Sequence, residues 1–535
     1  MARAFLAVVL IALACTLVRS ARVGLAGDYI DPVGRIAAQD EALYANSSIA
    51  MARHDHWLTP AFMGRPALYK PPMLIWLSAL ASRIGGISRL ALRFPVALMC
   101  ALAAGLIFLW TAELDRWQAG ACAVALLLSD HLWHVLSGMA LTDGLLAAFW
   151  AAALYFLFSD PWLELAGALW GFAASVAAAI LSKSVAGLLP LAILGLYWIA
   201  APPKRRPRLA RVALAAGLSL ALAAPWFIYQ AAVHYRWFWT EMARVEILGF
   251  GTGAPPQTSQ ESQVLFYVKR LLLLDPPLAA MAIVGLPPLF RELRARRVDA
   301  ILLACWMAVA LLSVFAWSYR NAAYLLPAIP ALAIVAAVYS PIATSRTAMA
   351  ILALVVVWKV LTPATPWGIS FASGTVQPLA PLVSSYCARD RGNELILVGL
   401  DDDLYASALP LPKLRYCLVG AAPAREYGMP FRQMGIILTV PEYDDLPRWE
   451  PYFLQRLKAW GVKSTAPIGT LIMANSTQEL AQLIRAHPRS DFLMPAGYRD
   501  AADAVHEVIE AGRRHILLLG RPRIPAPPRA WSCGM

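Results

Sequence analysis

The chain has 535 residues, of which 59% are hydrophobic and only 15% are charged. Soluble domains carry about 45–50% apolar and about 25% charged residues. The mean hydropathy is +0.58, and the 19 tryptophans suit a protein that meets two water–lipid interfaces. This composition excludes a disordered, collagen-like or nucleic-acid-binding protein and argues against a wholly soluble enzyme. The formal net charge of +13 is then assigned to cytoplasmic loops and anionic membrane partners.

Apolar runs recur up to about residue 363, many of them long enough to cross a bilayer, which takes about 17–25 residues. We predict spans at 4–21, 91–112, 119–137, 144–158, 162–181, 184–200, 209–230, 265–289, 299–317, 321–340 and 347–362. The first run has features of a signal peptide, but the many later spans favour an uncleaved first helix. Segment 71–85 is apolar but short, which favours an interfacial or re-entrant helix.

Two short basic loops set the orientation. Residues 204–208 and 291–297 are rich in Lys and Arg, which indicates the cytoplasmic side. Counting spans from them places the following parts on the outer face, the periplasm of a bacterial cell: 22–90, 138–143, 182–183, 231–264, Arg320 and the C-terminal region.

The amino-acid composition changes after about residue 370, where charged residues and proline become common. We predict a transmembrane domain over 1–365 and an outer α/β domain over 366–535. The predicted strands and helices are Glu394–Leu400, Met434–Val440, Gly469–Met473 and His515–Leu519, and Gln478–Ala486 and Ala501–Arg513. Asp401–Asp403 is predicted to be a solvated turn rather than a cation site, and Cys387–Cys417 is the best candidate disulfide.

The loop of residues 22–70 is the longest polar insertion in the membrane half, and it contains the adjacent acids Asp40 and Glu41. They precede a helical run, so capping of its N-terminus is one interpretation. A general base or a metal ligand is the other. Asp143 is a second acid on the predicted outer face, with the same two alternatives of helix cap and chemistry.

Three cations share that predicted face: Lys70, Lys183 and Arg320. Each alone is expected to extend toward lipid headgroups. Together they could hold a phosphate, since Lys and Arg pair well with phosphate oxygens.

Histidines give a weaker signal. His54 and His56 flank an aspartate, but without further ligands a metal site there is disfavoured. Packing or headgroup contact is expected for His131 and His134. No cofactor is predicted with certainty, and a divalent metal is left open.

The order and spacing of several motifs resemble the polytopic lipid-linked-sugar glycosyltransferases of the GT-C fold. The resemblance covers about residues 1–340 and points to the bacterial branch of lipid A aminoarabinose transferases and protein O-mannosyltransferase (PMT) relatives. The matching motifs are Asp40-Glu41-x-x-Tyr44, Asp55-His-Trp-Leu-Thr-Pro60, Tyr69-Lys-Pro-Pro72 with Trp76, Leu92-Arg-Phe-Pro95, Leu141-Thr-Asp143, Leu181-Ser-Lys183 and Tyr324-Leu-Leu-Pro-Ala-Ile-Pro330.

The resemblance implies a polytopic α-helical fold with about 11–13 spans, interfacial helices in the first outer loop, and a polyprenyl-phosphate sugar donor used with inversion. Asp40, Glu41 and Asp143 would be catalytic, while Lys70, Arg320 and Lys183 would bind the donor phosphate. The substrate pocket would be lined by Tyr44, Tyr69, Tyr319 and Tyr324. Two departures weaken an exact aminoarabinose specificity: Leu43 stands where these enzymes carry Arg, and Tyr69 where they carry Glu.

Three hypotheses follow. The first is sugar transfer to lipid A or another envelope glycolipid at the bacterial inner membrane. The second is the same chemistry on a protein acceptor. The third is a transporter or flippase for a lipid-linked substrate, which is disfavoured because the candidate charges cluster at one face and no internal repeat is evident.

Overall fold

A computed structural model describes residues 1–22, 35–62, 65–68, 70–239, 242–243, 247, 262–317, 320–361, 393–398, 414–419, 471–474, 477–502, 506–511 and 515–521. By its contacts the chain divides into two units. Unit 1 comprises residues 1–22, 68–74 and 93–371, and unit 2 comprises residues 23–67, 75–92 and 372–535. The domain boundary expected near residue 365 stays a prediction.

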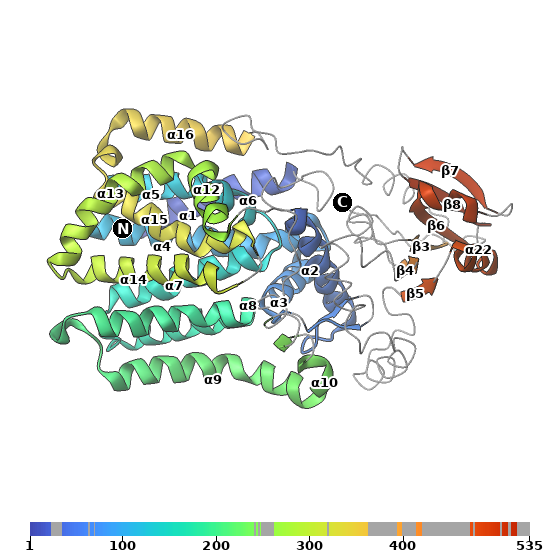
Figure 1. The fold of residues 1–535 in the computed structure, drawn as a ribbon, viewed down its shortest axis with the longest axis horizontal. Helices are drawn as coiled ribbons and strands as arrows, with labels where there is room; N and C mark the ends of the chain where they lie inside the picture. The colour runs from blue at the N-terminus through green and yellow to red at the C-terminus, as the bar shows by residue number, and fades with distance from the viewer. Residues whose placement is uncertain are drawn as a thin grey trace. The chain divides into compact units, whose positions relative to one another are not determined.

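Unit 1 is a helical bundle whose long members run roughly parallel or antiparallel (Figure 1). Among the described residues, six helices are long and apolar enough to cross a membrane, or up to seven if a bent pair is one span. The chain is therefore a polytopic α-helical membrane protein, as its composition predicted. The helices are α1 (Ala2–Arg22), α4 (Arg89–Leu114), α5 (Trp117–Ser129), α6 (His131–Leu136), α7 (Thr142–Ser159), α8 (Ala166–Ala200), α9 (Leu209–Val233), α10 (Tyr235–Phe238), α12 (Gln263–Leu274), α13 (Pro276–Arg294), α14 (Val298–Ser313), α15 (Ile329–Tyr339) and α16 (Arg346–Leu361), with 3-10 turns η1 (Pro203–Arg205), η3 (Val314–Ala316), η4 (Ala322–Ala328) and η5 (Pro341–Thr344).

Helix α8 is a helical hairpin rather than one 35-residue rod. Lys183 and Ser184 leave the helical conformation, with φ −149° and 34°. A Cβ added at Gly187 would overlap backbone atoms of Ala179 and Ile180, although residues seven apart in a straight helix lie about 10 Å apart. The chain therefore reverses at residues 183–184, which agrees with the predicted separate spans at 162–181 and 184–200.

Two other predicted spans are interrupted in the structure. The 119–137 span divides into α5 and α6 at Asp130. The 265–289 span divides into α12 and α13 at Asp275, with a bend of 106°. The cause of the second break is local, because Pro276 ends the preceding helix. Asp275 then caps α13 by accepting a hydrogen bond from the Leu278 backbone N–H.

The interior of unit 1 is held by stacked aromatic rings and a buried arginine. Trp110 stacks on Phe158 and Trp306, with ring centroids 4.6 and 5.8 Å apart. Such pairs stabilise by about 0.5–1.5 kcal/mol each beyond the area that they bury. Arg93 is fully buried and donates a 2.9 Å hydrogen bond to the Ser20 carbonyl at the end of α1.

The N-terminal part of unit 2 contains α2 (Arg35–His54), the short antiparallel pair β1 (Ala61–Phe62) and β2 (Arg65–Pro66), and most of α3 (Met73–Gly85). Helix α3 has 13 residues and a length of about 20 Å. It is too short to cross a hydrocarbon core of about 30 Å, which agrees with the prediction of an interfacial or re-entrant helix at 71–85.

The C-terminal part of unit 2 holds a six-stranded sheet of order β5-β4-β3-β6-β8-β7, with helix α22 packed on it. Strands β5, β4, β3 and β6 run parallel to one another, whereas the pairs β6–β8 and β8–β7 are antiparallel. Its elements are β3 (Glu394–Val398), β4 (Leu414–Val419), β5 (Leu471–Ala474), α22 (Thr477–Ala486), β6 (Ser490–Pro495), η7 (Ala496–Ala501), β7 (Glu507–Ala511) and β8 (His515–Leu519).

The predicted α/β character of this region is confirmed, with one correction. The helix predicted at 501–513 was wrong, because residues 507–511 form strand β7. Val508 and Ile509 suit a strand that pairs with β8. The strand predicted at 434–440, Asp401–Asp403 and Cys387 lie outside the described residues.

Candidate active site

An ion pair between Asp143 and Lys183 is the best-defined polar feature of the described spans. Asp143 lies in the first turn of α7, and Lys183 lies at the turn of the α8 hairpin. The Lys183 Nζ atom is 2.5 Å from Asp143 Oδ1, and the two side chains are only 15% and 14% exposed. Trp150 holds the second arm of the hairpin against α7 by donating to the Ala186 carbonyl. The alternative of Asp143 as a helix cap was wrong, since Leu141 occupies that position.

Tyr324 completes this arrangement from η4. Its ring centroid lies 4.8 Å from the Lys183 Nζ atom, a geometry that stabilises an ammonium by about 0.5–2 kcal/mol depending on desolvation. Asn321 starts η4 by accepting a 2.9 Å hydrogen bond from the Ala323 backbone N–H. The structure brings together three of the predicted site residues, Asp143, Lys183 and Tyr324, and their roles in catalysis and binding stay predictions.

A cavity opens beside the pair. It has a volume of about 70 Å³ and is lined by Asp143, Lys183, Trp150, Trp317 and Tyr324, together with side chains of α8, Ser313 and Val314. The pair places a cation and a carboxylate at the wall of this small cavity, where electrostatic interactions are stronger than in water.

The other two predicted cations belong to the same unit. Arg320 directly precedes the Asn321 cap, and its guanidinium carbon lies 5.8 Å from the Phe266 ring centroid on α12. Lys70 is half-buried in segment 68–74. The next residues, Pro71 and Pro72, are buried and restrict the backbone there. Their predicted role in phosphate binding stays a prediction.

The acids of the first loop lie on α2, in unit 2. Helix α2 begins at Arg35, so Asp40 and Glu41 lie in its second turn. The capping interpretation was therefore wrong, because they do not precede the helix. Glu41 and Tyr44 are buried, at 0% and 2% exposure. The Asp40 side chain lies outside the described part of the structure, and its catalytic role stays a prediction.

Some predicted site residues cannot be located. Tyr69, Tyr319 and the His54 side chain lie outside the described residues. His56 is buried, at 8% exposure. Within the described residues, no group of three or more His, Cys, Asp or Glu side chains is arranged to hold a metal ion.

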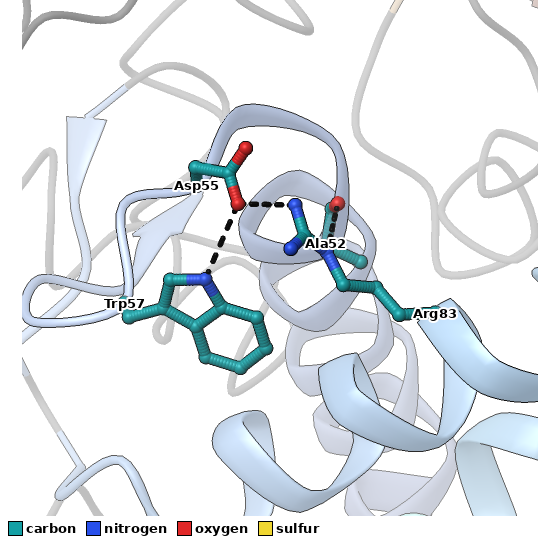
Figure 2. Close-up of polar contacts among 4 residues, drawn as sticks. All are labelled: Ala52, Asp55, Trp57 and Arg83. Carbon is teal, nitrogen blue, oxygen red and sulfur yellow. Dashed lines mark hydrogen bonds and ion pairs between the residues drawn. The ribbon is translucent and has the colours of Figure 1, made fainter.

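Figure 2 shows how Asp55, at the end of α2, is engaged. Its Oδ1 atom accepts hydrogen bonds from the Arg83 guanidinium on α3 and, at 3.4 Å, from the Trp57 indole. Arg83 also donates to the Ala52 carbonyl at 3.0 Å. Asp55 adopts φ 60°, a conformation that Asp tolerates better than most residues. These contacts hold the end of α2 against α3. Asp55, which lies between His54 and His56, therefore has a structural role.

The sequence reasoning missed Trp150 and Trp317, which line the cavity. Trp150 lies two helical turns after Asp143 on α7, and this spacing places both on one side of a helix. Trp317 lies only three positions before Arg320. A search for aromatic residues near each candidate charge would have found both.

Comparisons with known proteins agree with this geometry. Residues 69–229 match the family model of dolichyl-phosphate-mannose-protein mannosyltransferases. An uncharacterized protein of Aquifex aeolicus is 25% identical over 350 residues, which are 64% of this chain and 68% of that protein.

Solved structures of ArnT from Cupriavidus metallidurans are similar in fold. The undecaprenyl phosphate-bound form gives a TM-score of 0.64, and the apo form gives 0.62. Each is 17% identical in sequence and covers 97% of this chain and 98% of its own. The chain is thus a multi-pass membrane protein with the GT-C fold of ArnT, and it resembles the ArnT and PMT lipid-linked-sugar glycosyltransferases.

Proposed function

We propose that this protein is an inverting glycosyltransferase of the bacterial inner membrane. It transfers a sugar from a polyprenyl-phosphate donor, of the undecaprenyl-phosphate type, to lipid A or another envelope glycolipid at the periplasmic face. The observation that carries the proposal is the buried Asp143–Lys183 pair beside Tyr324. It lies at the wall of a cavity in a chain with the ArnT fold.

The cations serve the leaving group. In the transfer, the bond between the anomeric carbon and the phosphate oxygen breaks, and the phosphate leaves with the electron pair. Its negative charge grows in the transition state, so fixed cations lower the barrier. We assign Lys70 and Arg320 to the phosphate, with Lys183 beside them. Asp143 orients Lys183 through their ion pair.

The acids serve the acceptor. Its oxygen attacks the anomeric carbon from the face opposite to the phosphate, which inverts the configuration. If the acceptor is a hydroxyl group, Asp40 takes its proton as a general base. If the acceptor is a phosphate, it is already an anion, and Asp40 and Asp143 instead orient the sugar and stabilise positive charge at the anomeric carbon. Glu41 supports Asp40 from the same turn of α2.

An apolar groove supports a lipid-linked donor. It has a volume of about 800 Å³ and is lined almost wholly by apolar side chains of α12, α13, α14 and α15. Along α13 it extends from Leu278 to Leu293, which is about 22 Å of helix. Leu312 lines this groove and the adjacent Ser313 lines the active-site cavity. In this proposal the prenyl chain lies in the groove and its phosphate end is directed to the cavity.

A protein acceptor is the second candidate, because the matched family model is described by protein mannosyltransferases. Comparing the lipid A, other glycolipids and glycoproteins of cells with and without this chain by mass spectrometry separates the two. A sugar added to a glycolipid supports the first acceptor, and a glycosylated protein supports the second.

The decisive variant is Asp40→Asn. We expect it to abolish transfer in membranes supplied with a polyprenyl-phosphate sugar, while the protein still inserts and purifies as a monodisperse species. Asp115→Asn is the matched control, since Asp115 is exposed at the start of the α4–α5 loop. Normal transfer by Asp40→Asn would overturn the assignment. Loss of transfer in both variants would remove the argument for a special role of Asp40.

A further inference from the structure

Three buried ionisable residues lie near one another away from the Asp143–Lys183 pair, and one of them, Asp130, lines the apolar groove. Asp130 ends α5 and starts α6, Asp275 ends α12 and starts α13, and Lys359 lies near the end of α16. Their exposures are 2%, 4% and 2%. Charged residues inside a membrane protein are costly and are retained for a use.

Each carboxylate satisfies a helix start at a broken span. Asp130 accepts a 2.7 Å hydrogen bond from the Trp133 backbone N–H. Asp275 accepts a 3.3 Å hydrogen bond from the Leu278 backbone N–H. The Lys359 ammonium donates to the Ser129 carbonyl, next to Asp130 at the first break. The Ser129 side chain is in turn a hydrogen-bond partner of Asp275 at the second break. Lys359 and Ser129 therefore connect α16 to both breaks.

Helix α12 ends at the second break, and two of its side chains contact the segment that carries Trp317 and Tyr324. The Gln263 side-chain amide donates to the carbonyls of Val314 and Trp317, at 2.9 and 2.7 Å. The Tyr267 hydroxyl accepts a 3.3 Å hydrogen bond from the Asn321 backbone N–H. Asn321 caps the turn that carries Tyr324. The orientation of α12 therefore determines where Trp317 and Tyr324 lie.

We infer that Lys359 is a positioning residue. By tying Asp275 to Asp130 it fixes the bend between α12 and α13, and α12 in turn holds segment 314–324 against the cavity. For its effect on sugar transfer the inference rests on the proposed function, but its effect on the bend does not. A displacement of about 1 Å at a reacting site can cost about 100-fold in rate, so a loosened α12 is expected to impair donor binding.

The cluster predicts an order among variants. Lys359→Met removes the cation that lies near two buried carboxyl groups, so we expect it to be the most damaging single change. Asp275→Asn keeps the cation beside Asp130 and is expected to be milder. The triple variant Asp130→Asn/Asp275→Asn/Lys359→Met has no buried charge in this cluster. It should fold even if Lys359→Met does not.

The bend is measured by electron paramagnetic resonance between two spin labels in lipid nanodiscs. The labels are attached to cysteines placed at the exposed positions Leu265 on α12 and Val284 on α13, in a background without native cysteines. We expect a narrow distance distribution for the parent protein and a broad one for Lys359→Met, or for the triple variant if the single one fails to fold. The matched control is Arg346→Met, which removes an exposed cation from the start of the same helix.

The same variants are assayed for transfer. We expect the loss of Lys359 to raise KM for the lipid-linked donor about 10-fold or more, within the usual range of coupling between distant sites, with a smaller fall in kcat. A narrow, unchanged distribution in a folded variant without Lys359 would overturn the inference. If the distribution broadens without Lys359 but the parent protein itself shows no transferase activity, the positioning role is upheld and the proposed function is refuted.

Discussion

Replacing Lys183 by Met tests the proposed chemistry most directly. The substitution keeps a long side chain at the hairpin turn but removes the ammonium that pairs with Asp143 at 2.5 Å. The Asp143 carboxylate, 14% exposed, then loses its partner in a poorly solvated place. Leaving one partner of a fully buried pair alone costs about 3–5 kcal/mol. The remaining exposure puts the expected loss near the lower end, at about 3 kcal/mol.

The effect on catalysis is separable from the effect on folding. Removing one preorganised electrostatic contact from a transition state costs about 100- to 1,000-fold in kcat. Lys183→Met should show this loss. The double variant Asp143→Asn/Lys183→Met has no unpaired charge, so it should regain most of the stability while staying inactive. Asp143→Asn keeps the cation and should retain more activity than either.

The assay measures thermal unfolding of the three purified variants in detergent and their transfer of sugar from a polyprenyl-phosphate donor. The reasoning is refuted if Lys183→Met transfers sugar at the parent rate, because the cation would then contribute nothing to the leaving group. It is refuted equally if the double variant recovers activity together with stability. In that case the pair would be needed only for folding.

Three further predictions use other parts of the chain. Gly187→Val should prevent the α8 hairpin from closing, because even a Cβ there overlaps the opposite backbone, and it should destabilise by at least about 2 kcal/mol in thermal unfolding. Ala308→Trp should fill the apolar groove and raise KM for a long-chain donor but not for a short-chain one, while exposed Ala350→Trp should raise neither; equal effects on both donors would contradict a tail in the groove. Arg83→Gln should remove its contact with Asp55 at a cost of about 0.5–1 kcal/mol, seen as faster hydrogen exchange over residues 50–58 with unchanged exchange in α7.

Much of the membrane architecture could be predicted from the sequence, because a bilayer demands apolar helices of a set length. The span count predicts Asp143 and Lys183 at the same end of adjacent segments. In the structure their side chains are in contact. A charged pair at the turns of neighbouring spans can thus be predicted, because the length of the spans places both turns at the same face of the membrane.

Interactions between distant segments could not be predicted in this way. The length and apolarity of residues 265–289 suggested one span, and only the Asp275-Pro276-Pro277 sequence gave a local signal for the break. Nothing local links Lys359 to Ser129, which lies 230 positions away. Similarly, residues 507–511 became a strand because β8 lies beside them, and tertiary pairing overrides helical preference.

The two broken spans and the α8 hairpin turn differ in how their charged residues are used. A break in a spanning helix frees backbone groups that lipid cannot satisfy. At Asp130 and Asp275 the side chains accept hydrogen bonds from those freed amides, so their charge is used within the fold. The α8 turn joins two separate spans, and its Lys183 ammonium cannot accept from an amide. It is paired with Asp143, lies over Tyr324 and lines a cavity. We therefore expect an anionic substrate group at Lys183 rather than at Asp130 or Asp275.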